Sequence, residues 1–356
     1  MAVSFFFIEI CCFFFKKYII FVKLKFIKMK LKTSYLGLEI KSPIIVSSST
    51  LTGSVESIKH CAEAGAGAVI LKSIFEEQIL SEIRREERYT DNEIYDLYPE
   101  AQEYLNTFMR GTEIEIYEKL VRESKKNVDI PIIASVNCST DGEWTSIARE
   151  LQDAGADAIE LNIAISAFDR DLDPRKIEEE YVKILKDVEK NINIPVSVKL
   201  GDHFTNISRM AFSLTKAGAK GLVLFNRFYN PDINIEKMKA VPGNSISAPE
   251  ENHNTLRWIS LLSSQGLPCE LSASRGVYTG EDVVKQILAG AKTVQVCSTL
   301  YRNGIDYIKQ MNADVEAWMD RHNFSNVENF RGIVNKKEDI NVVERLQYLR
   351  RNYDIH

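Results

Sequence analysis

The sequence lacks the residue patterns that mark metal-bound, disulfide-linked and nucleic-acid-binding proteins. Its six cysteines include no C-x-x-C pair and no clustered spacing with the five histidines, so neither a metal site nor a disulfide framework is expected. This cysteine usage favours a reducing, cytoplasmic setting. The chain also has no block of Lys or Arg, and its formal net charge is -5, which argues against nucleic acid as a main partner.

A long hydrophobic run is missing as well. Residues 1–28 are rich in Phe, Ile, Lys and Val, but Glu9, Lys16 and Lys17 interrupt them before a run reaches the roughly 18 residues that span a bilayer. A secretory signal fits poorly, because charge does not precede the apolar core and no small-residue cleavage site follows. We therefore interpret residues 1–28 as an N-terminal extension outside the fold, with Met29 as the working start. An amphipathic membrane anchor is the alternative.

From Met29 onward, two kinds of short apolar segment alternate along the chain. One kind follows an A-G-A turn and the other begins with a proline, a residue tolerated at the start of a strand but excluded from its interior. The A-G-A kind covers residues 68–71, 158–161, 221–225 and 293–296, and the proline kind covers 43–46, 131–134, 195–198 and 268–271. Helical patterns lie between most of them, for example over Lys176–Lys190 and Ile207–Lys216.

Eight strands that alternate with helices predict an α/β protein with a parallel (β/α)8 barrel. Because strand order cannot be read from the sequence, an open α/β sheet remains the alternative. The expected organisation is a single barrel over residues 29–356, with insertions at about 73–129 and 227–254. Both insertions leave from the C-terminal ends of strands, where long loops form lids or substrate pockets.

Polar residues follow all eight predicted strands. Since the carboxyl ends of barrel strands meet at one mouth, these side chains are expected to converge there. Gly and Ser turns after the seventh and eighth strands occupy the usual phosphate position of such barrels, where backbone N–H groups can hold an anion. The residues at the strand ends are Ser47, Ser48, Ser49, Lys72, Ser73, Ser135, Asn137, Asn162, Lys199, Asn226, Arg227, Ser274, Arg275, Gly276, Cys297 and Ser298.

These motifs, in their order, resemble the dihydroorotate dehydrogenases, which are FMN-dependent (β/α)8 barrels of pyrimidine synthesis. The resemblance is closest to the soluble class 1 type and covers about Leu36 to Asn303. It is carried by Lys72-Ser73, Glu160-Leu161-Asn162, Val198-Lys199-Leu200, Asn226, the Gly276–Asp282 segment and Gln295–Thr299.

The resemblance implies FMN as cofactor, dihydroorotate as the default substrate and a homodimer as the assembly, with no nucleic-acid or membrane partner. It implies catalytic roles for Lys72, Asn162 and Asn226, and Ser166 is added as a catalytic candidate because it neighbours the position of the family's base. The residues that it implies at the cofactor are Ser47, Ser48, Ser49, Lys72, Ser73, Ser135, Asn162, Lys199, Phe225, Ser247, Ala248, Ser274, Arg275, Gly276, Cys297 and Ser298.

The sequence departs from the family pattern where the family places its base. In the family, the loop after the fourth strand carries a Cys or Ser that takes a proton from the substrate. Here Ile165 stands at that position, and isoleucine cannot transfer a proton. Ser166, the next residue, is one possible replacement, and His203 and Cys138 are other acid–base candidates near the rim.

Arg227 is a further departure, because the family has a small hydroxyl residue after the asparagine that Asn226 matches. The guanidinium group suggests a different, anionic ligand. The sequence thus predicts an FMN-dependent oxidoreductase of a divergent branch. The alternatives are a flavin oxidoreductase of another small substrate, a non-catalytic flavin- or phosphate-binding barrel subunit, and a barrel lyase or aldolase using Lys72 or Lys199.

Overall fold

A computed structural model describes residues 30–75, 114–137, 143–163, 165, 170–227, 231–244 and 246–336. Several sequence predictions lie outside these residues. They concern the extension at residues 1–28, the catalytic candidates Ser166 and Cys138, and most of the first insertion. The division into one domain with an extension therefore stays a prediction.

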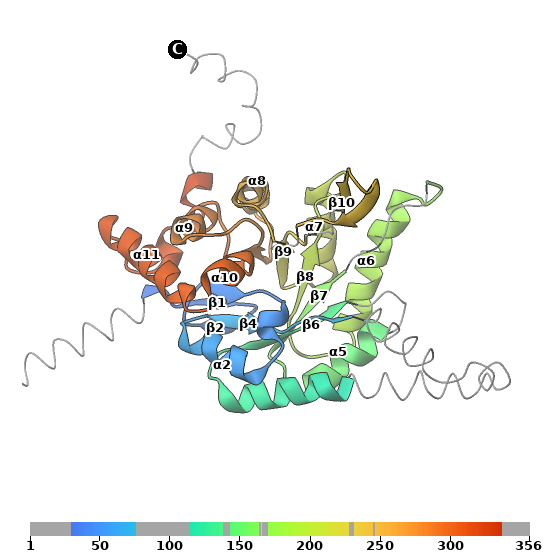
Figure 1. The fold of residues 1–356 in the computed structure, drawn as a ribbon, viewed down its shortest axis with the longest axis horizontal. Helices are drawn as coiled ribbons and strands as arrows, with labels where there is room; N and C mark the ends of the chain where they lie inside the picture. The colour runs from blue at the N-terminus through green and yellow to red at the C-terminus, as the bar shows by residue number, and fades with distance from the viewer. Residues whose placement is uncertain are drawn as a thin grey trace, which may run out of the picture.

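Eight parallel strands form a closed barrel, which confirms the predicted fold (Figure 1). They follow the order β4-β3-β13-β12-β9-β8-β7-β6, and β4 also pairs with β6, which closes the cylinder. Every strand predicted from the two kinds of apolar segment is present. The barrel strands are β3 (Ile44–Val46), β4 (Ala68–Ile70), β6 (Ile132–Asn137), β7 (Ala158–Asn162), β8 (Val196–Leu200), β9 (Gly221–Leu224), β12 (Glu270–Ala273) and β13 (Thr293–Val296). A short strand, β5 (Ile74–Phe75), also pairs with β6.

Helices surround the barrel (Figure 1). Capping residues begin several of them: Asp173 caps α6 ahead of Pro174 at the first turn, and the Thr279 hydroxyl accepts from Asp282 N–H at the start of α9. Residues 114–127 are also helical. The other bounds are α2 (Val55–Glu63), α5 (Glu143–Asp153), α6 (Pro174–Glu189), α7 (Ile207–Ala217), α8 (Asn252–Ser264), α9 (Gly280–Leu288), α10 (Ser298–Asn303) and α11 (Tyr307–Arg321), with 3-10 turns at Thr50–Thr52, Pro249–Glu251, Val327–Asn329 and Ile333–Lys336.

The A-G-A turns explain why strands follow these helices so closely. In each turn the glycine has a positive φ, from 96° at Gly65 to 127° at Gly218, a conformation that L-residues with side chains rarely adopt. The glycine therefore ends the helix and lets the chain enter the next strand after two or three residues. This local chemistry is why the repeat predicted strand positions so well.

Side chains of each barrel strand alternate between two environments. On β7, Ile159 and Leu161 belong to the large apolar cluster that also includes the helix residues. Ala158 belongs to a separate small cluster inside the barrel, so Glu160 and Asn162, at the same phase of the strand, also face the interior. The barrel thus has an apolar outer layer and a partly polar inside.

A hairpin closes the N-terminal end of the barrel. It is formed by β1 (Thr33–Tyr35) and β2 (Leu38–Ile40), and its Tyr35, Leu36 and Ile40 pack into the interior cluster. The Leu36 N–H donates to the Glu270 carboxylate on β12. This end of the barrel is therefore filled by side chains.

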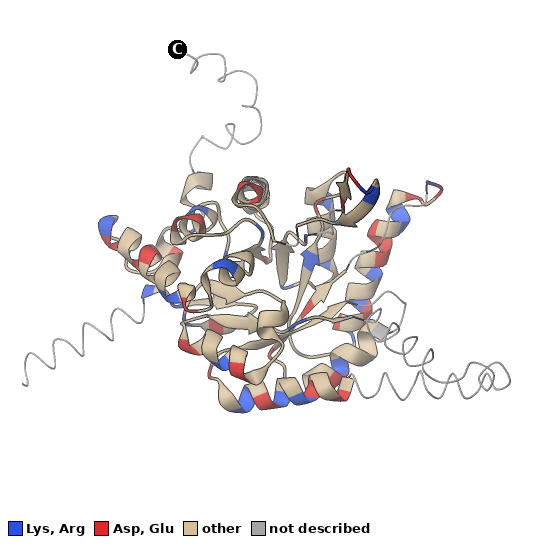
Figure 2. Cartoon of the chain, viewed as in Figure 1, with Lys and Arg blue, Asp and Glu red and all other residues tan. Residues whose placement is uncertain are grey.

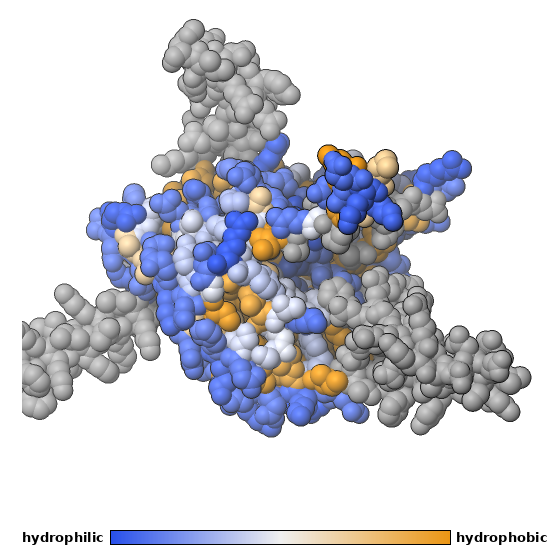
Figure 3. Space-filling model, in the orientation of Figure 1, coloured by the Kyte–Doolittle hydropathy of each residue, from blue (hydrophilic) through white to orange (hydrophobic). Residues whose placement is uncertain are grey.

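The insertion after β9 contains a second hairpin, β10 (Pro231–Asn234) with β11 (Lys239–Pro242), which stands at the upper edge of the molecule (Figure 1). It exposes Ile233, Ile235 and Met238, and apolar atoms are visible there (Figure 3). Residues with charges of both signs are interspersed along the outer helices (Figure 2). None of the helices in the described part of the chain is both long and apolar enough to cross a bilayer.

Candidate functional site

Two asparagines and a lysine meet at the mouth of the barrel. In the register of β7 and β8, Asn162 lies directly opposite Lys199, and both residues are buried. Asn226 follows the end of β9, and its Nδ2 donates to Asn162 Oδ1 at 2.8 Å. Three residues that the sequence predicted at the mouth are therefore neighbours, because parallel strands end at the same rim.

Lys199 is buried to 7% exposure and is held by three acceptors. Its Nζ lies 3.2 Å from Ser47 Oγ, 3.3 Å from Gln295 Oε1 and 3.6 Å from Glu160 Oε1. Gln295 Nε2 in turn donates to Glu160 Oε2 at 2.7 Å. The ammonium group consequently has a fixed position below the mouth, and a buried carboxylate balances its charge.

A row of serine hydroxyls borders this cluster. Ser73 Oγ lies 3.0 Å from Ser48 Oγ and 2.7 Å from Ser135 Oγ. The Ser73 N–H also donates to Ser48 Oγ at 2.8 Å, and the Tyr117 hydroxyl accepts from Ser135 N–H at 3.1 Å. These contacts join the ends of β3, β4 and β6 and place three predicted residues side by side.

Lys72 is the half-buried lysine at the end of β4. Its aliphatic chain lies beside Gly53, where an added Cβ would come within 3.7 Å of Lys72 Cδ. In contrast to Lys199, its ammonium group makes no ion pair or side-chain hydrogen bond within the described residues. Ser49 Oγ, at the end of β3, is buried beside the Cys297 thiol. The Lys72 ammonium group therefore has donors to offer to a ligand.

The turns predicted to bind phosphate come together around Ser247. Its Oγ lies 2.9 Å from Ser298 Oγ and accepts from the Gly276 N–H at 3.3 Å. The Ser247 N–H donates to Ser298 Oγ at 3.1 Å, and the Tyr278 hydroxyl donates to the Ser247 carbonyl. Gly276 has φ +66°, and a Cβ there would lie 2.2 Å from Asn252 N, so only glycine fits.

Arg275 contacts carboxylates, whereas the sequence predicted a contact with a phosphate. Its guanidinium group donates to Glu251 Oε2 at 2.7 and 2.9 Å and to Asp202 Oδ2 at 2.9 Å. Burial acts to raise the pKa of Glu251, but the Ala248 N–H and the Arg275 guanidinium outweigh it and hold this pKa below its ordinary value. The Arg275 side chain therefore ties together the loops after β8 and β12 and the start of α8, and its predicted bond to a phosphate is untested.

Arg227 is held in the same cluster. Its Nη1 donates to the Asn244 carbonyl at 2.7 Å, and its Nε lies 3.4 Å from Glu251 Oε1. The predicted role of Arg227 in binding an anion would require this guanidinium group to contact a ligand while it keeps or exchanges these partners.

The remaining predicted cofactor residues lie at the same rim. Phe225 is fully buried, Ser274 is buried after β12, and the Ala248 N–H donates to Glu251. Burial raises the pKa of the Cys297 thiol, with Ser49 and Lys199 acting in the opposite direction. This thiol is therefore mostly protonated at neutral pH.

The loop after β7 has no ionisable group at the position of the family's base. Ile165 packs against the large apolar cluster, and the neighbouring Ser166 lies outside the described residues. His203, on the loop after β8, stacks on Phe204 with 4.7 Å between ring centroids, and partial burial lowers its pKa. Phe204 packs edge-on against Tyr181, whose hydroxyl donates to the Ile163 carbonyl at 3.0 Å. His203 is thus on the side of the rim that carries Ile165.

Sequence reasoning missed several residues of this site. Glu160 and Gln295 were read only as parts of strand motifs, yet both contact Lys199. Asp202 and Glu251 were not singled out, although they hold Arg275. Glu160 and Gln295 are each a charged or amide residue in the middle of an otherwise apolar strand. Such a residue is buried only with a partner, so this pattern predicts a polar contact inside the barrel.

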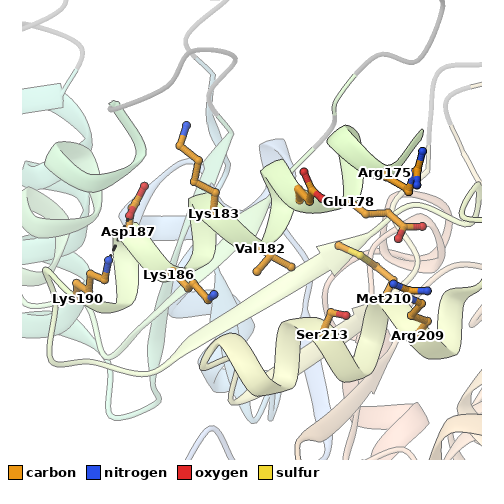
Figure 4. Close-up of a pocket in the computed structure, with 11 residues that line it drawn as sticks. Arg175, Glu178, Val182, Lys183, Lys186, Asp187, Lys190, Arg209, Met210 and Ser213 are labelled. Atoms are coloured by element: carbon orange, nitrogen blue, oxygen red, sulfur yellow. Dashed lines mark ion pairs between the residues drawn. The ribbon is translucent and has the colours of Figure 1, made fainter. Parts of the chain in front are cut away.

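A separate hollow of about 540 Å³ lies between α6 and α7 on the outside of the barrel (Figure 4). It is bordered by charges of both signs, among them Lys190 and Asp187, which form an ion pair at 3.8 Å. The strand-end residues do not line it. We interpret this hollow as a solvated helix surface and not as part of the site. Among the described residues, no group of three or more His, Cys, Asp or Glu side chains is arranged to hold a metal ion.

Comparison with known proteins decides the family. A sequence model of the dihydroorotate dehydrogenase family matches residues 96–319 of this chain. The chain belongs to the dihydroorotate dehydrogenase family. It is therefore an oxidoreductase of the dihydroorotate dehydrogenase type, and members of this family are flavoproteins that bind FMN.

Curated relatives agree over most of the chain. The protein is 26% identical over 298 residues to the dihydroorotate dehydrogenase B (NAD(+)) catalytic subunit of Methanocaldococcus jannaschii, which covers 83% of this chain and 95% of that protein. It is 27% identical over 308 residues to the protein of the same name from Methanosarcina acetivorans, covering 83% and 94%. The one from Thermoplasma volcanium is 26% identical over 315 residues, covering 86% and 99%. The resemblance inferred from motifs is thus confirmed as a distant one.

Proposed function

We propose that this protein binds FMN at the barrel mouth and oxidises a small, planar or carboxylated substrate, with dihydroorotate as the first candidate. The observation that carries the proposal is that Asn162 lies opposite Lys199 in the strand register and accepts a hydrogen bond from Asn226, at the same rim as the hydrogen-bonded Ser247 and Gly276. Amide and ammonium groups of this kind suit the polar edges of a flavin and of an orotate-like ring.

The residues present fit FMN in their donor chemistry. The Lys72 ammonium group has unused donors among the described residues, and Gly276 and Ser298 bring an N–H and a hydroxyl group together, as a phosphate requires. FMN, when bound, would supply the two-electron redox chemistry. Lys199 would place a fixed positive charge at the ring, Asn162 and Asn226 would orient the substrate, and Lys72 would add a second donor.

The unsettled part of the proposal is the group that removes the substrate's proton. Ile165 cannot do so, which favours either a replacement base or a substrate that needs none. Ser166 is the replacement that the sequence suggests, and His203, whose lowered pKa leaves it neutral at pH 7, is the second. A flavin oxidoreductase of a different small substrate is therefore the second candidate function, favoured by Ile165 and by Arg227.

The names of the relatives give information about their electron acceptor. They are named as catalytic subunits of NAD(+)-linked enzymes. We propose that electrons leave this protein through a soluble acceptor or a partner protein, because its sequence contains no second flavin motif and no iron–sulfur cysteine set.

The test is anaerobic addition of dihydroorotate to the FMN-loaded protein while the flavin absorbance is followed. Bleaching that is lost in Asn162→Ala and kept in Asn127→Ala, a control on an exposed helix surface, would support dihydroorotate oxidation. Loss of bleaching in Ser166→Ala or His203→Gln would identify the base. A yellow protein whose flavin absorbance does not change on addition of dihydroorotate would support the second candidate function. A protein that cannot bind FMN would contradict both.

A further inference from the structure

Glu160 is a carboxylate in the middle of the barrel. It lies on β7, two residues below Asn162, and its side chain is 0% exposed. Burying an ionised carboxylate is unfavourable unless a positive charge and hydrogen-bond donors surround it. A residue that only filled space at this position would be apolar, as the neighbouring interior residues Ala158 and Ile133 are.

Glu160 contacts Lys199 directly and also through Gln295. Its Oε1 is 3.6 Å from Lys199 Nζ and accepts no hydrogen bond from the described residues, while its Oε2 accepts from Gln295 Nε2. Gln295 Oε1 faces the same ammonium group at 3.3 Å. This amide can satisfy both neighbours in one orientation only, with oxygen toward the lysine and nitrogen toward the carboxylate. Glu160 therefore fixes Lys199 both directly and through Gln295.

Glu270, a second carboxylate inside the barrel, has different partners from Glu160. Glu270 on β12 also faces the interior, but at the N-terminal end, where it accepts from the Leu36 N–H. Burial raises the pKa of Glu270, with Lys292 and Arg331 acting against it. Glu270 thus serves the hairpin that closes the barrel, whereas Glu160 faces the lysine at the mouth.

We propose that Glu160 is a positioning residue that holds the Lys199 ammonium group in place and offsets part of its charge. In this way it sets how strongly the site prefers reduced over oxidised FMN. This inference rests on the proposed FMN site. A positive charge at the flavin favours the reduced form, so a carboxylate beneath that charge weakens the preference.

The first measurement compares the affinities for oxidised and anaerobically reduced FMN in the wild type, Glu160→Gln and Lys199→Met. We expect Glu160→Gln to raise the ratio of reduced-form to oxidised-form affinity about tenfold, because it removes a unit negative charge from beside the Lys199 ammonium group. Lys199→Met should lower the ratio. Glu160→Asp, which keeps the charge, should stay near the wild-type ratio, and Glu270→Gln should leave it unchanged.

The double variant separates a positioning role from a general charge effect. If Glu160 acts by holding Lys199 and offsetting its charge, Glu160→Gln in the Lys199→Met background should change the ratio little. An unchanged ratio in Glu160→Gln, or the same tenfold change in both backgrounds, would overturn the inference while leaving FMN binding intact. A wild type that binds no FMN would instead refute the proposed function, and this role with it.

The same coupling has a readout without flavin. Removing one member of a buried pair leaves an uncompensated charge. The double variant should therefore lose less stability, measured as its unfolding temperature, than the sum of the losses in the two single variants. If Glu160→Gln fails to fold and the added Lys199→Met restores folding, the pair is coupled as proposed. Strictly additive losses of stability, or failure of the double variant to fold, would contradict it.

Discussion

The two ends of the barrel use similar polar residues in opposite ways. At the N-terminal end, Glu270 accepts from the backbone of the β1–β2 hairpin, and Glu328 binds Thr33, Lys292 and Arg331 at 2.6 to 2.8 Å. At the mouth, the Lys72 ammonium group keeps unused donors within the described residues. The filled end holds the fold together, and the end with spare donors is suited to bind a ligand.

This contrast follows from what each end must do. Buried charges with partners rigidify a fold, whereas a charged group with unused donors is available to a ligand. Changes at the N-terminal end should therefore alter stability with little effect on FMN affinity, whereas changes at the mouth should alter FMN binding as well. The following predictions test this division, from the largest expected effect to the smallest.

Replacing Tyr35, the buried aromatic residue of the β1–β2 hairpin, should have the largest effect on stability. Tyr35 is 1% exposed and fills the N-terminal end of the barrel. Tyr35→Ala should lower the free energy of unfolding by about 3–5 kcal/mol, as for other buried aromatic residues, measured by urea denaturation. The FMN affinity of the folded fraction should not change. Ile235→Ala, on the exposed hairpin, should cost less than about 0.5 kcal/mol. A loss of FMN affinity in Tyr35→Ala would show that the two ends are not independent.

The turn at Gly276 should be the most sensitive position of the mouth. Gly276→Ala places a Cβ 2.2 Å from Asn252 N at φ +66°, so the backbone around Ser247 must move. We expect a loss of about 2–3 kcal/mol in stability and a fall in FMN affinity of about a hundredfold.

Gly266 provides a matched control for this substitution. It has φ +67° but nothing within 4 Å of a new Cβ, so Gly266→Ala should cost only about 1 kcal/mol and leave FMN affinity unchanged. Equal effects of the two substitutions would mean that backbone strain alone, and not the close approach to Asn252, explains the requirement for glycine.

The Arg275 cluster should have a moderate effect. If its guanidinium group acts mainly by joining loops through Glu251 and Asp202, Arg275→Met and Glu251→Gln should both weaken FMN binding, each by less than about tenfold. Titration with FMN measures this. A loss of about a hundredfold in Arg275→Met, together with tighter binding in Glu251→Gln, would show instead that Arg275 binds the phosphate directly.

Glu328 should have the smallest effect, and one that depends on pH. Burial acts to raise the pKa of Glu328, but Lys292, Thr33 and Arg331 lower it to about 2. Because the folded-state pKa is depressed, the carboxylate stabilises the fold above its ordinary pKa near 4.5, and this contribution is lost as the pH falls toward 2. After allowance for partial exposure, Glu328→Gln should cost about 1 kcal/mol at pH 7. Urea denaturation at pH 7 and pH 3 should show the difference shrinking; a constant difference would contradict the prediction.

The fold was readable from the chain because its signals are local. The A-G-A glycines have positive φ and the prolines begin strands, so each turn or strand start depends on a few adjacent residues. The location of the mouth was also predictable, since polar residues after apolar strands mark the C-terminal ends. Arg275 was harder: its sequence position suggested an anion, but the structure pairs it with carboxylates 24 and 73 residues away.

The sequence by itself determined eight strands that alternate with helices, polar residues at their C-terminal ends and a resemblance to the family, because strand, turn and motif signals lie within short stretches of chain. Only the tertiary structure decided which buried charge faces which. Glu160, Lys199 and Gln295 come from three strands far apart along the chain, and Glu270 lies at the other end of the same interior. Barrel closure brings these residues to their partners, and the low-dielectric interior makes each pairing matter.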